Sequence, residues 1–321
     1  MILCCGESLI DFVPLEGGQG YRPFPGGSIY NIAVALGRLQ APVGFLGRIS
    51  TDFFGDLLAD YLVKNGVKLD FTQRADGPTT LAFVSLPGQS EEPRYVFYAA
   101  EAVDRSLQVA DLPAQLPADI QALHFGSISL VLEPGASTLE TLMRRESRQT
   151  GVGEAVRRPT LSLDPNVRPS LIADRDAFRG RFESWVRLVD IVRLSDADLE
   201  WLYPGADSDQ MMRTWLGWGP VMCLLTRGAR GASGYTAAGV TAWADAPVVD
   251  VADTVGAGDT FFAAALAWLH RQNLLGNRPA LRDLSQAQLG ACLAYAVRAA
   301  AINCSRPGAN PPYLHEMESL P

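Results

Sequence analysis

The sequence is short of lysine, histidine and paired cysteines, and each shortage excludes a class of protein. Only Lys64 and Lys68 are lysines and neither follows a glycine-rich loop, which excludes a Walker-type phosphate loop. The three histidines have no HExxH spacing, so a zinc hydrolase is not expected. No GxGxxG or GxSxG pattern occurs in the required context, which removes the main support for a dinucleotide enzyme or a serine hydrolase.

Positive charge and long apolar runs are also scarce. The formal net charge is -8 and no cluster of lysine and arginine forms a stripe, so a nucleic-acid partner is not expected. We expect no membrane partner, because no apolar run is long enough to span a bilayer. The first five residues form no charged leader and the five cysteines have no CxxC spacing, which predicts reduced cysteines and a cytoplasmic location.

What is present is a large apolar fraction organised by alternating patterns. The chain has 321 residues, 48% of them hydrophobic, enough to bury the core of one large domain, 1–321. Alternation of strand-type and helix-type patterns predicts an α/β fold with a doubly wound, mostly parallel sheet flanked by helices on both faces. The expected strands are 2–6, 43–46, 123–127, 160–163, 191–194, 221–226 and 248–251, and the expected helices are 29–39, 54–62, 136–149, 178–189 and 262–269.

Two segments, 12–25 and 79–98, break this alternation. Their strand-type patterns predict a small β-sheet lid outside the main sheet. A sheet of so few strands is marginal in water unless its apolar face is covered, and Phe83, Tyr95 and Phe97 are expected to supply that face. Two lids packed together would cover it, which predicts a homodimer whose lids close over the ligand.

One stretch of small residues, 253–261, predicts a site for an anion. It follows the β-branched run at 248–251 and precedes the apolar segment at 262–269, an order typical of a strand, a turn and a buried helix. The first N–H groups of such a helix are uncovered, and together with the helix dipole they favour phosphate binding. The turn that would expose them consists of Gly256, Ala257 and Gly258.

Asp259 places a carboxylate inside this predicted anion site, where its charge would repel the ligand. It is either a helix cap, a role that aspartate fills well, or a base that takes the proton from a hydroxyl attacking a phosphoryl group. Residue types alone favour neither interpretation.

Polar residues also follow the first predicted strand. Asp11 is either a ligand contact near the end of that strand or an ordinary turn carboxylate. Gly26 and Gly27 allow a ligand to approach the backbone, or simply form a turn before a helix whose predicted N-cap is Ser28. Asn31 interrupts the apolar face of that helix, where its amide is placed to bond a sugar hydroxyl.

Three further polar clusters follow predicted strands, at the sheet edge where such folds bind ligands. Arg168 is suited to bind phosphate or sugar hydroxyls. Asp198 is either a helix cap or a ligand near Mg²⁺, and the neighbouring Asp196 is expected to be a cap. The turn at 226–231 contains glycines and two arginines, which suits nucleotide phosphates, although such turns are common.

Taken together, these clusters resemble the PfkB family of sugar kinases, also called ribokinase-like, over essentially the whole chain. The two strongest anchors are the segment 25–27 with Asn31 near the start, and the segment 253–261 near the end. Two anchors in the family's order are more specific than either alone. Within the family, the segments 6–11 and 164–168 look most like fructokinases.

The resemblance implies a phosphotransferase that moves the γ-phosphate of ATP to a primary hydroxyl of a sugar, with fructose as the expected sugar, ATP and Mg²⁺ as cofactors and K⁺ as an activator. It implies that Asp259 is the base and that the turn at 256–258 binds the transferring phosphoryl group. The implied contacts are Asp11, Gly26, Gly27, Asn31 and Arg168 for the sugar; Asn166, Ser195, Thr226, Gly228 and Gly231 for the nucleotide; Asp198 for Mg²⁺ through water; and Asp253, Val255 and Gly308 for a monovalent cation.

The sequence departs from the family pattern at two places. Ser195 and Asp198 stand where the family usually has Asn and Glu. Ala99 stands where many fructokinases have an arginine, for which Arg105 is the candidate substitute. Two alternatives stay open: a kinase for another sugar, a sugar acid or a nucleoside, and a non-catalytic sugar or nucleotide sensor on the same fold. The carboxylate of Asp259 argues against the sensor.

Overall fold

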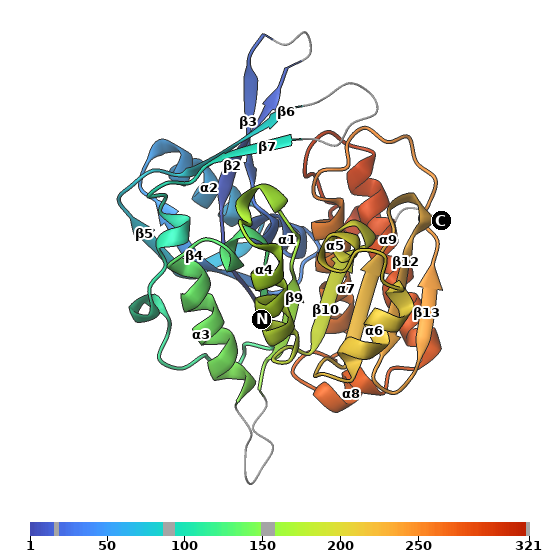
Figure 1. Cartoon of the computed structure of the whole chain (residues 1–321). Coiled ribbons are helices and arrows are strands. Elements are labelled where there is room, and N and C mark those ends of the chain that lie inside the picture. The colour runs from blue at the N-terminus through green and yellow to red at the C-terminus, as the bar shows by residue number, and fades with distance from the viewer. Residues whose placement is uncertain (16–18, 86–93, 149–157, 319–321) are drawn as a thin grey trace.

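Two sheets organise the residues that the computed structural model describes, which are 1–15, 19–85, 94–148 and 158–318 (Figure 1). The larger sheet contains β1 (Ile2–Cys5), β4 (Val43–Ser50), β5 (Val67–Ala75), β8 (Ala122–Gly126), β9 (Thr160–Asp164), β10 (Ile191–Ser195), β11 (Met222–Thr226), β12 (Ala232–Thr236) and β13 (Thr241–Ala244). The smaller sheet contains β2 (Leu9–Pro14), β3 (Tyr21–Gly26), β6 (Thr80–Ser85) and β7 (Arg94–Tyr98).

Helices cover both faces of the larger sheet. They are α1 (Ser28–Arg38), α2 (Phe53–Lys64), α3 (Gly135–Ser147), α4 (Arg175–Val186), α5 (Asp196–Leu202), α6 (Ser208–Leu216), α7 (Ala257–Arg271), α8 (Arg278–Arg282), α9 (Gln286–Cys304) and α10 (Leu314–Glu318). The strand order is β13-β12-β11-β10-β9-β8-β1-β4-β5. Neighbouring strands from β5 to β11 are parallel, whereas β12 pairs antiparallel with both β11 and β13. The predicted doubly wound, mostly parallel sheet is confirmed.

Strand β1 shows why the sheet needs helices on both faces. Its side chains alternate, since successive residues of a strand point to opposite sides. Ile2 and Cys4 pack with α1, α7 and α9, whereas Leu3 and Cys5 pack with α3, α4 and α6. All four side chains are fully buried, so the strand is apolar throughout. Both layers exclude water, which leaves the ends of the strands as the place where polar side chains can meet a ligand.

The ligand-binding end of the sheet follows from the position of β1, which lies between β4 and β8. The strand order reverses direction at β1, and open α/β sheets bind ligands beyond the carboxyl ends of the strands at such a point. The smaller sheet stands over this end of the molecule (Figure 1). A separate small sheet is confirmed, but β2 begins at Leu9, before the predicted segment 12–25, so Asp11 is a strand residue of this sheet and not a turn residue. Residues 16–18 and 86–93 of the two predicted segments lie outside the described residues.

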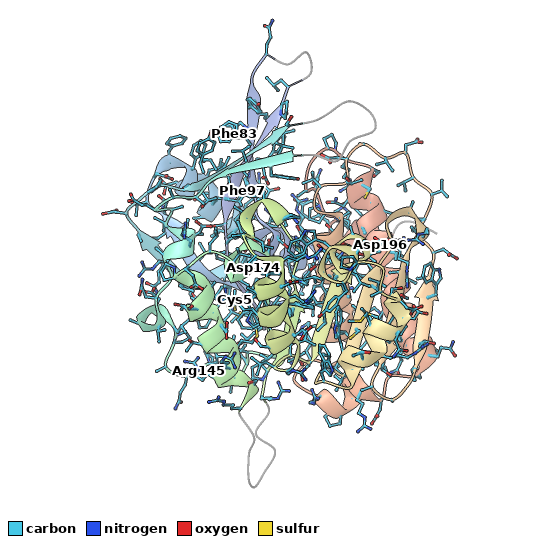
Figure 2. All side chains as sticks on the ribbon, in the orientation of Figure 1. Cys5, Phe83, Phe97, Arg145, Asp174 and Asp196 are labelled. Carbon is cyan, nitrogen blue, oxygen red and sulfur yellow. The ribbon has the colours of Figure 1, made fainter. Side chains whose placement is uncertain are left out.

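The prediction for the apolar face of the smaller sheet was partly wrong. Phe83 lies directly opposite Val96, and Ala82 lies directly opposite Phe97, so Phe83 and Phe97 point to opposite faces. Figure 2 labels both rings. Tyr95 shares the face of Phe97, which lines the cavity described below. Phe83 instead faces outward, where its ring stacks on Phe12 at 4.7 Å between centroids.

Other differences from the predicted elements have local causes. The run 248–251 is not a strand: Val248 is fully exposed and Val251 is 64% exposed, so neither side chain gains the burial that favours a strand. Strands β5, β12 and β13 were not predicted. β5 and β13 are the two edges of the sheet, with partly exposed side chains, and β12 has a glycine at its centre.

Candidate active site

A cavity of about 690 Å³ separates the carboxyl ends of the strands from the smaller sheet. Its walls come from segments that are far apart in the sequence. The predicted site residues that line it are Asp11, Gly27, Asn31, Asn166, Arg168, Val255, Gly256, Gly258 and Asp259. The predicted residues that do not line it are Gly26, Ser195, Asp198, Thr226, Gly228, Gly231, Asp253, Ala257 and Gly308.

Asp259 lies in the first turn of α7 and is the most strongly hydrogen-bonded carboxylate of the cavity wall. Its side chain is 6% exposed. Ser28 Oγ donates to Oδ1 at 2.6 Å, and Asn31 Nδ2 donates to Oδ2 at 2.9 Å. Asn166 Nδ2 lies 3.4 Å from Oδ1. The carboxylate therefore accepts from α1 and from the segment after β9, and α7 has no side-chain cap at Gly256. This arrangement favours the base over the helix cap.

The pKa of Asp259 is set by two opposing influences. Burial raises the pKa, because the charged form loses its hydration. The hydrogen bonds from Ser28 and Asn31 lower the pKa, and so do the positive charges of Arg168 and Arg193. The net direction is upward. A carboxyl in such a place is a stronger proton acceptor than one in water, which suits a general base.

The start of α7 keeps part of the predicted anion site available. The N–H of Ala257 donates to the carbonyl of Thr254 at 3.2 Å, and the N–H of Thr260 donates to the carbonyl of Gly256 at 2.8 Å. Within the described part of the chain, the N–H groups of Gly256 and Gly258 have no protein acceptor. These two groups, not the whole turn 256–258, are therefore free to donate to an anion.

Arg193 is a buried charged residue beside the candidate site that the sequence patterns did not reveal. It lies in β10, is 4% exposed, and donates to Asp164 Oδ2 and to Thr226 Oγ1, both at 2.6 Å. Its guanidinium packs so closely on Gly258 that a Cβ there would lie 2.7 Å from Nη1. A side chain at position 258 would displace this guanidinium. A single arginine within the apolar strand 191–195 was the available signal, since a buried charge requires a partner.

Asp164 is the counterion of Arg193 and is fully buried. Burial raises the pKa of Asp164 to about 6, and the charge of Arg193 opposes that rise. Its other oxygen accepts the N–H of Asn166 at 3.0 Å. The ion pair thus connects the floor of the anion site to the segment that carries Asn166 and Arg168.

Asp11 and Arg168 form the opposite wall of the cavity. Gly26 lies against Asp11, where a Cβ would be 2.1 Å from Oδ2, so a side chain at position 26 would displace the Asp11 carboxylate. Burial raises the pKa of Asp11 to about 7, with Arg168 lowering it and Asp259 raising it. Arg168 Nη1 donates to Asn166 Oδ1 at 2.7 Å, and its guanidinium lies 5.8 Å from the centroid of the Tyr95 ring.

The segment after β10 is organised mainly as a helix cap. Ser195 is the N-cap of α5, and its Oγ accepts the N–H of Asp198 while the Asp198 carboxylate accepts from the Ser195 backbone. The other Asp198 oxygen accepts the N–H of Val167 at 2.8 Å. Asp196 was expected to be the cap. It is instead the first helical residue and forms an ion pair with Arg230 at 2.7 Å.

The residues predicted to hold a monovalent cation do lie together. Asp253 Oδ1 accepts the N–H of Val255, and its Oδ2 accepts the N–H of Gly308, both at 2.9 Å. The carbonyl of Val255 accepts from Asn303 Nδ2 at 2.8 Å. The loop before α7 is therefore tied to the segment after α9.

Two other predictions are corrected by side-chain geometry. Ser28 is not the N-cap of α1, because the cap is Gly27 and the Ser28 hydroxyl is bonded to Asp259. Arg105 does not line the cavity, and its guanidinium donates to the carbonyls of Glu133 and Ala99. It therefore does not replace the arginine that many fructokinases carry at position 99.

Comparison with known proteins decides the family. The model of the pfkB family of carbohydrate kinases matches residues 1–316. This chain belongs to that family. A fructokinase from Rhizobium leguminosarum bv. trifolii is 41% identical over 283 residues, which cover 87% of this chain and 82% of that protein. A probable fructokinase-3 from Arabidopsis thaliana is 33% identical and covers 100% of this chain and 90% of its own length.

Solved structures agree with that assignment. The crystal structure of a fructokinase with bound ATP from Xylella fastidiosa is 29% identical, has a TM-score of 0.87, and covers 99% of this chain and 97% of that one. This pfkB family kinase has the ribokinase-like α/β fold and is a phosphotransferase with an alcohol group as acceptor. None of the helices in the described part of the chain is long and apolar enough to cross a membrane.

Proposed function

We propose that this chain is an ATP-dependent fructokinase, which transfers the γ-phosphoryl group of ATP to a primary hydroxyl of fructose. The observation that carries the proposal is the carboxylate of Asp259, buried in the cavity wall at the start of α7 and held by donors from two other segments. The fructokinase relatives support fructose as the sugar. The ATP-bound fructokinase structure supports ATP as the donor.

In this proposal Asp259 takes the proton from the sugar hydroxyl as its oxygen attacks the γ-phosphorus. The N–H groups of Gly256 and Gly258 donate to the oxygens of the transferring group, where negative charge is concentrated. Arg193 supports them from beneath, because its buried positive charge lies against Gly258. Ala257 contributes by shaping the helix start, since its own N–H is bonded to Thr254.

The sugar lies between α1 and the smaller sheet in this proposal. Asp11 accepts from sugar hydroxyls, Asn31 offers the carbonyl of its amide, and Arg168 donates from the same wall as Asp11. Gly27 admits the sugar close to the backbone, and Gly26 acts indirectly by giving Asp11 its position. Because Asp11 and Asp259 are both carboxylates that line one cavity, a bound hydroxylated ligand relieves their repulsion by hydrogen-bonding both.

ATP is expected beyond the cavity, along the ends of β10 and β11. Gly228 and Gly231 lie in the turn after β11, and no atom within 4 Å would meet a Cβ at Gly228, so that part of the turn is open to a ligand. Thr226 and Asn166 orient Arg193 and Arg168. The hydroxyl of Ser195 is part of the α5 cap. Ser195 is therefore expected to contact the nucleotide through atoms other than its hydroxyl.

Mg²⁺ fits this site as a companion of ATP. The described residues contain no group of three or more His, Cys, Asp or Glu that would hold a metal ion. That suits Mg²⁺, which keeps several waters and takes phosphate oxygens from its substrate. Asp198 is the carboxylate that would contact those waters, because its Oδ1 accepts only the N–H of Val167 and retains a second lone pair, whereas Oδ2 accepts both the N–H and the hydroxyl of Ser195. Bound Mg²⁺ would supply positive charge to the phosphates.

We also infer a monovalent cation beside the anion site, with K⁺ as the expected ion. Asp253 joins the backbone at Val255 and Gly308, and carbonyl oxygens of these two segments are the ligands that a hard cation prefers. A cation there would steady the turn from which Gly256 and Gly258 donate.

The whole chain, 1–321, is proposed to act as one domain whose smaller sheet is a lid. Tyr95 and Phe97 point from that sheet into the cavity, so closing it over the sugar would expel water. The outward face carries Phe12, Phe83 and the exposed Tyr98. A second copy of this chain is the proposed cover of that face, which makes the protein a homodimer. Its free cysteines fit the cytoplasm.

The test is release of ADP across a panel of sugars, sugar acids and nucleosides, with the parent protein and Asp259→Asn. We expect fructose to give the highest kcat/KM. Asp259→Asn should bind fructose and ATP but lose about 10²- to 10⁴-fold in kcat, the usual contribution of a positioned base. A variant with kcat within a few-fold of the parent would remove the assignment of Asp259, and a higher kcat/KM for another substrate would remove fructose.

A further inference from the structure

Among the residues that the structure describes, the hydroxyl of Ser28 has a single hydrogen-bond acceptor, and that acceptor is the carboxylate proposed to be the base. Ser28 Oγ lies 2.6 Å from Asp259 Oδ1, and both side chains are 6% exposed. A hydroxyl has one proton to donate, so Ser28 cannot donate to a substrate at the same time. Its position is fixed by α1, whose first helical residue it is.

Nothing in the local structure of α1 requires a hydroxyl at this position. The N-cap of the helix is Gly27, and the cap receives no side-chain hydrogen bond. The hydroxyl therefore does not stabilise the start of α1 by capping it. The bond to Asp259 joins residues 231 positions apart in the sequence. It therefore serves the site and not the helix.

We propose that Ser28 is a positioning residue for the base: its hydroxyl holds Oδ1 of Asp259 in place and keeps the carboxylate ionised, so that Oδ2 and the free lone pairs face the attacking hydroxyl. This inference rests on the proposed role of Asp259. Ser28, Asn31 and Asn166 all line the cavity. The role of Ser28 differs because its one proton is donated to Asp259, whereas each amide has further donor and acceptor positions with which it can meet the sugar.

The size of the effect follows from the burial of the pair. A hydrogen bond to a charged group is worth more than one between neutral groups, and here it opposes the burial that raises the pKa of Asp259. Loss of the bond should therefore raise that pKa further, by about one unit. The other charged or titratable groups that interact with Asp259 are Asp11, Tyr95, Asp164, Arg168 and Arg193, and all of them stay unchanged when Ser28 is altered.

The experiment compares the pH dependence of kcat/KM for fructose in four variants with that of the parent. Ser28→Ala removes the hydroxyl and Ser28→Thr keeps it. Ser8→Ala is the matched control, because Ser8 is also buried and its hydroxyl has no hydrogen-bond partner among the described residues. Asp259→Asn tests the proposed function itself, since the acid limb of the profile should disappear with the carboxylate.

We expect the acid limb to move upward by about one pH unit in Ser28→Ala. At a pH on that limb, kcat/KM should fall about tenfold, while on the alkaline plateau kcat should stay within about threefold of the parent. Ser28→Thr should restore the parent's limb, and Ser8→Ala should not move it.

The outcomes separate the two ideas. If the limb stays in place in Ser28→Ala but is lost in Asp259→Asn, the base is right and the role of Ser28 is wrong. A loss of activity in Ser28→Ala that is equal at every pH also overturns the inference, because it indicates a structural defect only. If Asp259→Asn keeps the limb, the proposed function fails and the inference fails with it.

Discussion

The ion pair between Arg193 and Asp164 permits a quantitative test, because it is buried and its two partners can be neutralised separately or together. The perturbations are Arg193→Gln, Asp164→Asn and the double variant. Removing one partner of a buried pair typically costs about 3–5 kcal/mol of stability, since the other charge is left without compensation. The double variant should recover much of that loss, because two amides of similar size can hydrogen-bond each other.

The pH dependence of Arg193→Gln follows from the pKa of Asp164, which is raised to about 6 in the folded protein. An unfolded aspartate has a pKa near 3.9, so the folded state holds a proton that the unfolded state has released. The contribution of Asp164 to the free energy of unfolding therefore falls between about pH 4 and pH 6 and is level above that range.

Without Arg193 the pKa of Asp164 should rise further, toward about 8, as for carboxyls buried without a partner. The fall then continues to about pH 8, at up to about 1.4 kcal/mol per pH unit. Between pH 6 and pH 8, the free energy of unfolding of Arg193→Gln should fall by about 2–3 kcal/mol, whereas that of the parent should stay level. Urea unfolding followed by tryptophan fluorescence at pH 6, 7 and 8 measures this difference, and parallel profiles for variant and parent would refute the reasoning.

Three further predictions concern the ligands. Asp11→Ala should raise KM for fructose by about 10- to 100-fold, because a contacted hydroxyl loses its partner. A change confined to KM for ATP would contradict the proposed contact between Asp11 and the sugar. K⁺ should raise kcat relative to a bulky organic cation at equal ionic strength, and equal rates would exclude the cation near Val255 and Gly308. Fructose should slow hydrogen exchange in residues 79–85 and 94–98; unchanged exchange together with a monomeric mass in solution would contradict the lid and the dimer.

The fold could be predicted from the sequence because the spacing of apolar residues can be read within a single segment of the chain. Strands such as 160–163 and 191–194 are apolar runs between helical patterns, and each is a strand of the sheet. The run 248–251 is also rich in β-branched residues but is not a strand, and such residues form a strand only when pairing and burial follow. The composition of a run does not tell whether a partner strand is present.

The candidate site was predicted unevenly for a related reason. Asp259 and its glycines stand out because they interrupt a pattern within a few residues. Ser28 and Arg193 do not stand out, because what makes them notable is a partner 231 and 29 residues away. The orientation of Phe83 and Phe97 depends on the register between strands, and register is not visible in either strand alone.

The same long separations govern when the protein can first become active. The hydrogen-bond donors to Asp259 are residues 28, 31 and 166. The first 166 residues therefore contain all three donors but not the carboxylate that they hold. During synthesis, which proceeds from the N-terminus, the first half of the molecule can form sheet and helices yet hold no catalytic centre. Turnover in a refolding experiment therefore reports the arrival of α7 beside α1, and its recovery cannot precede the contact between residues 28 and 259.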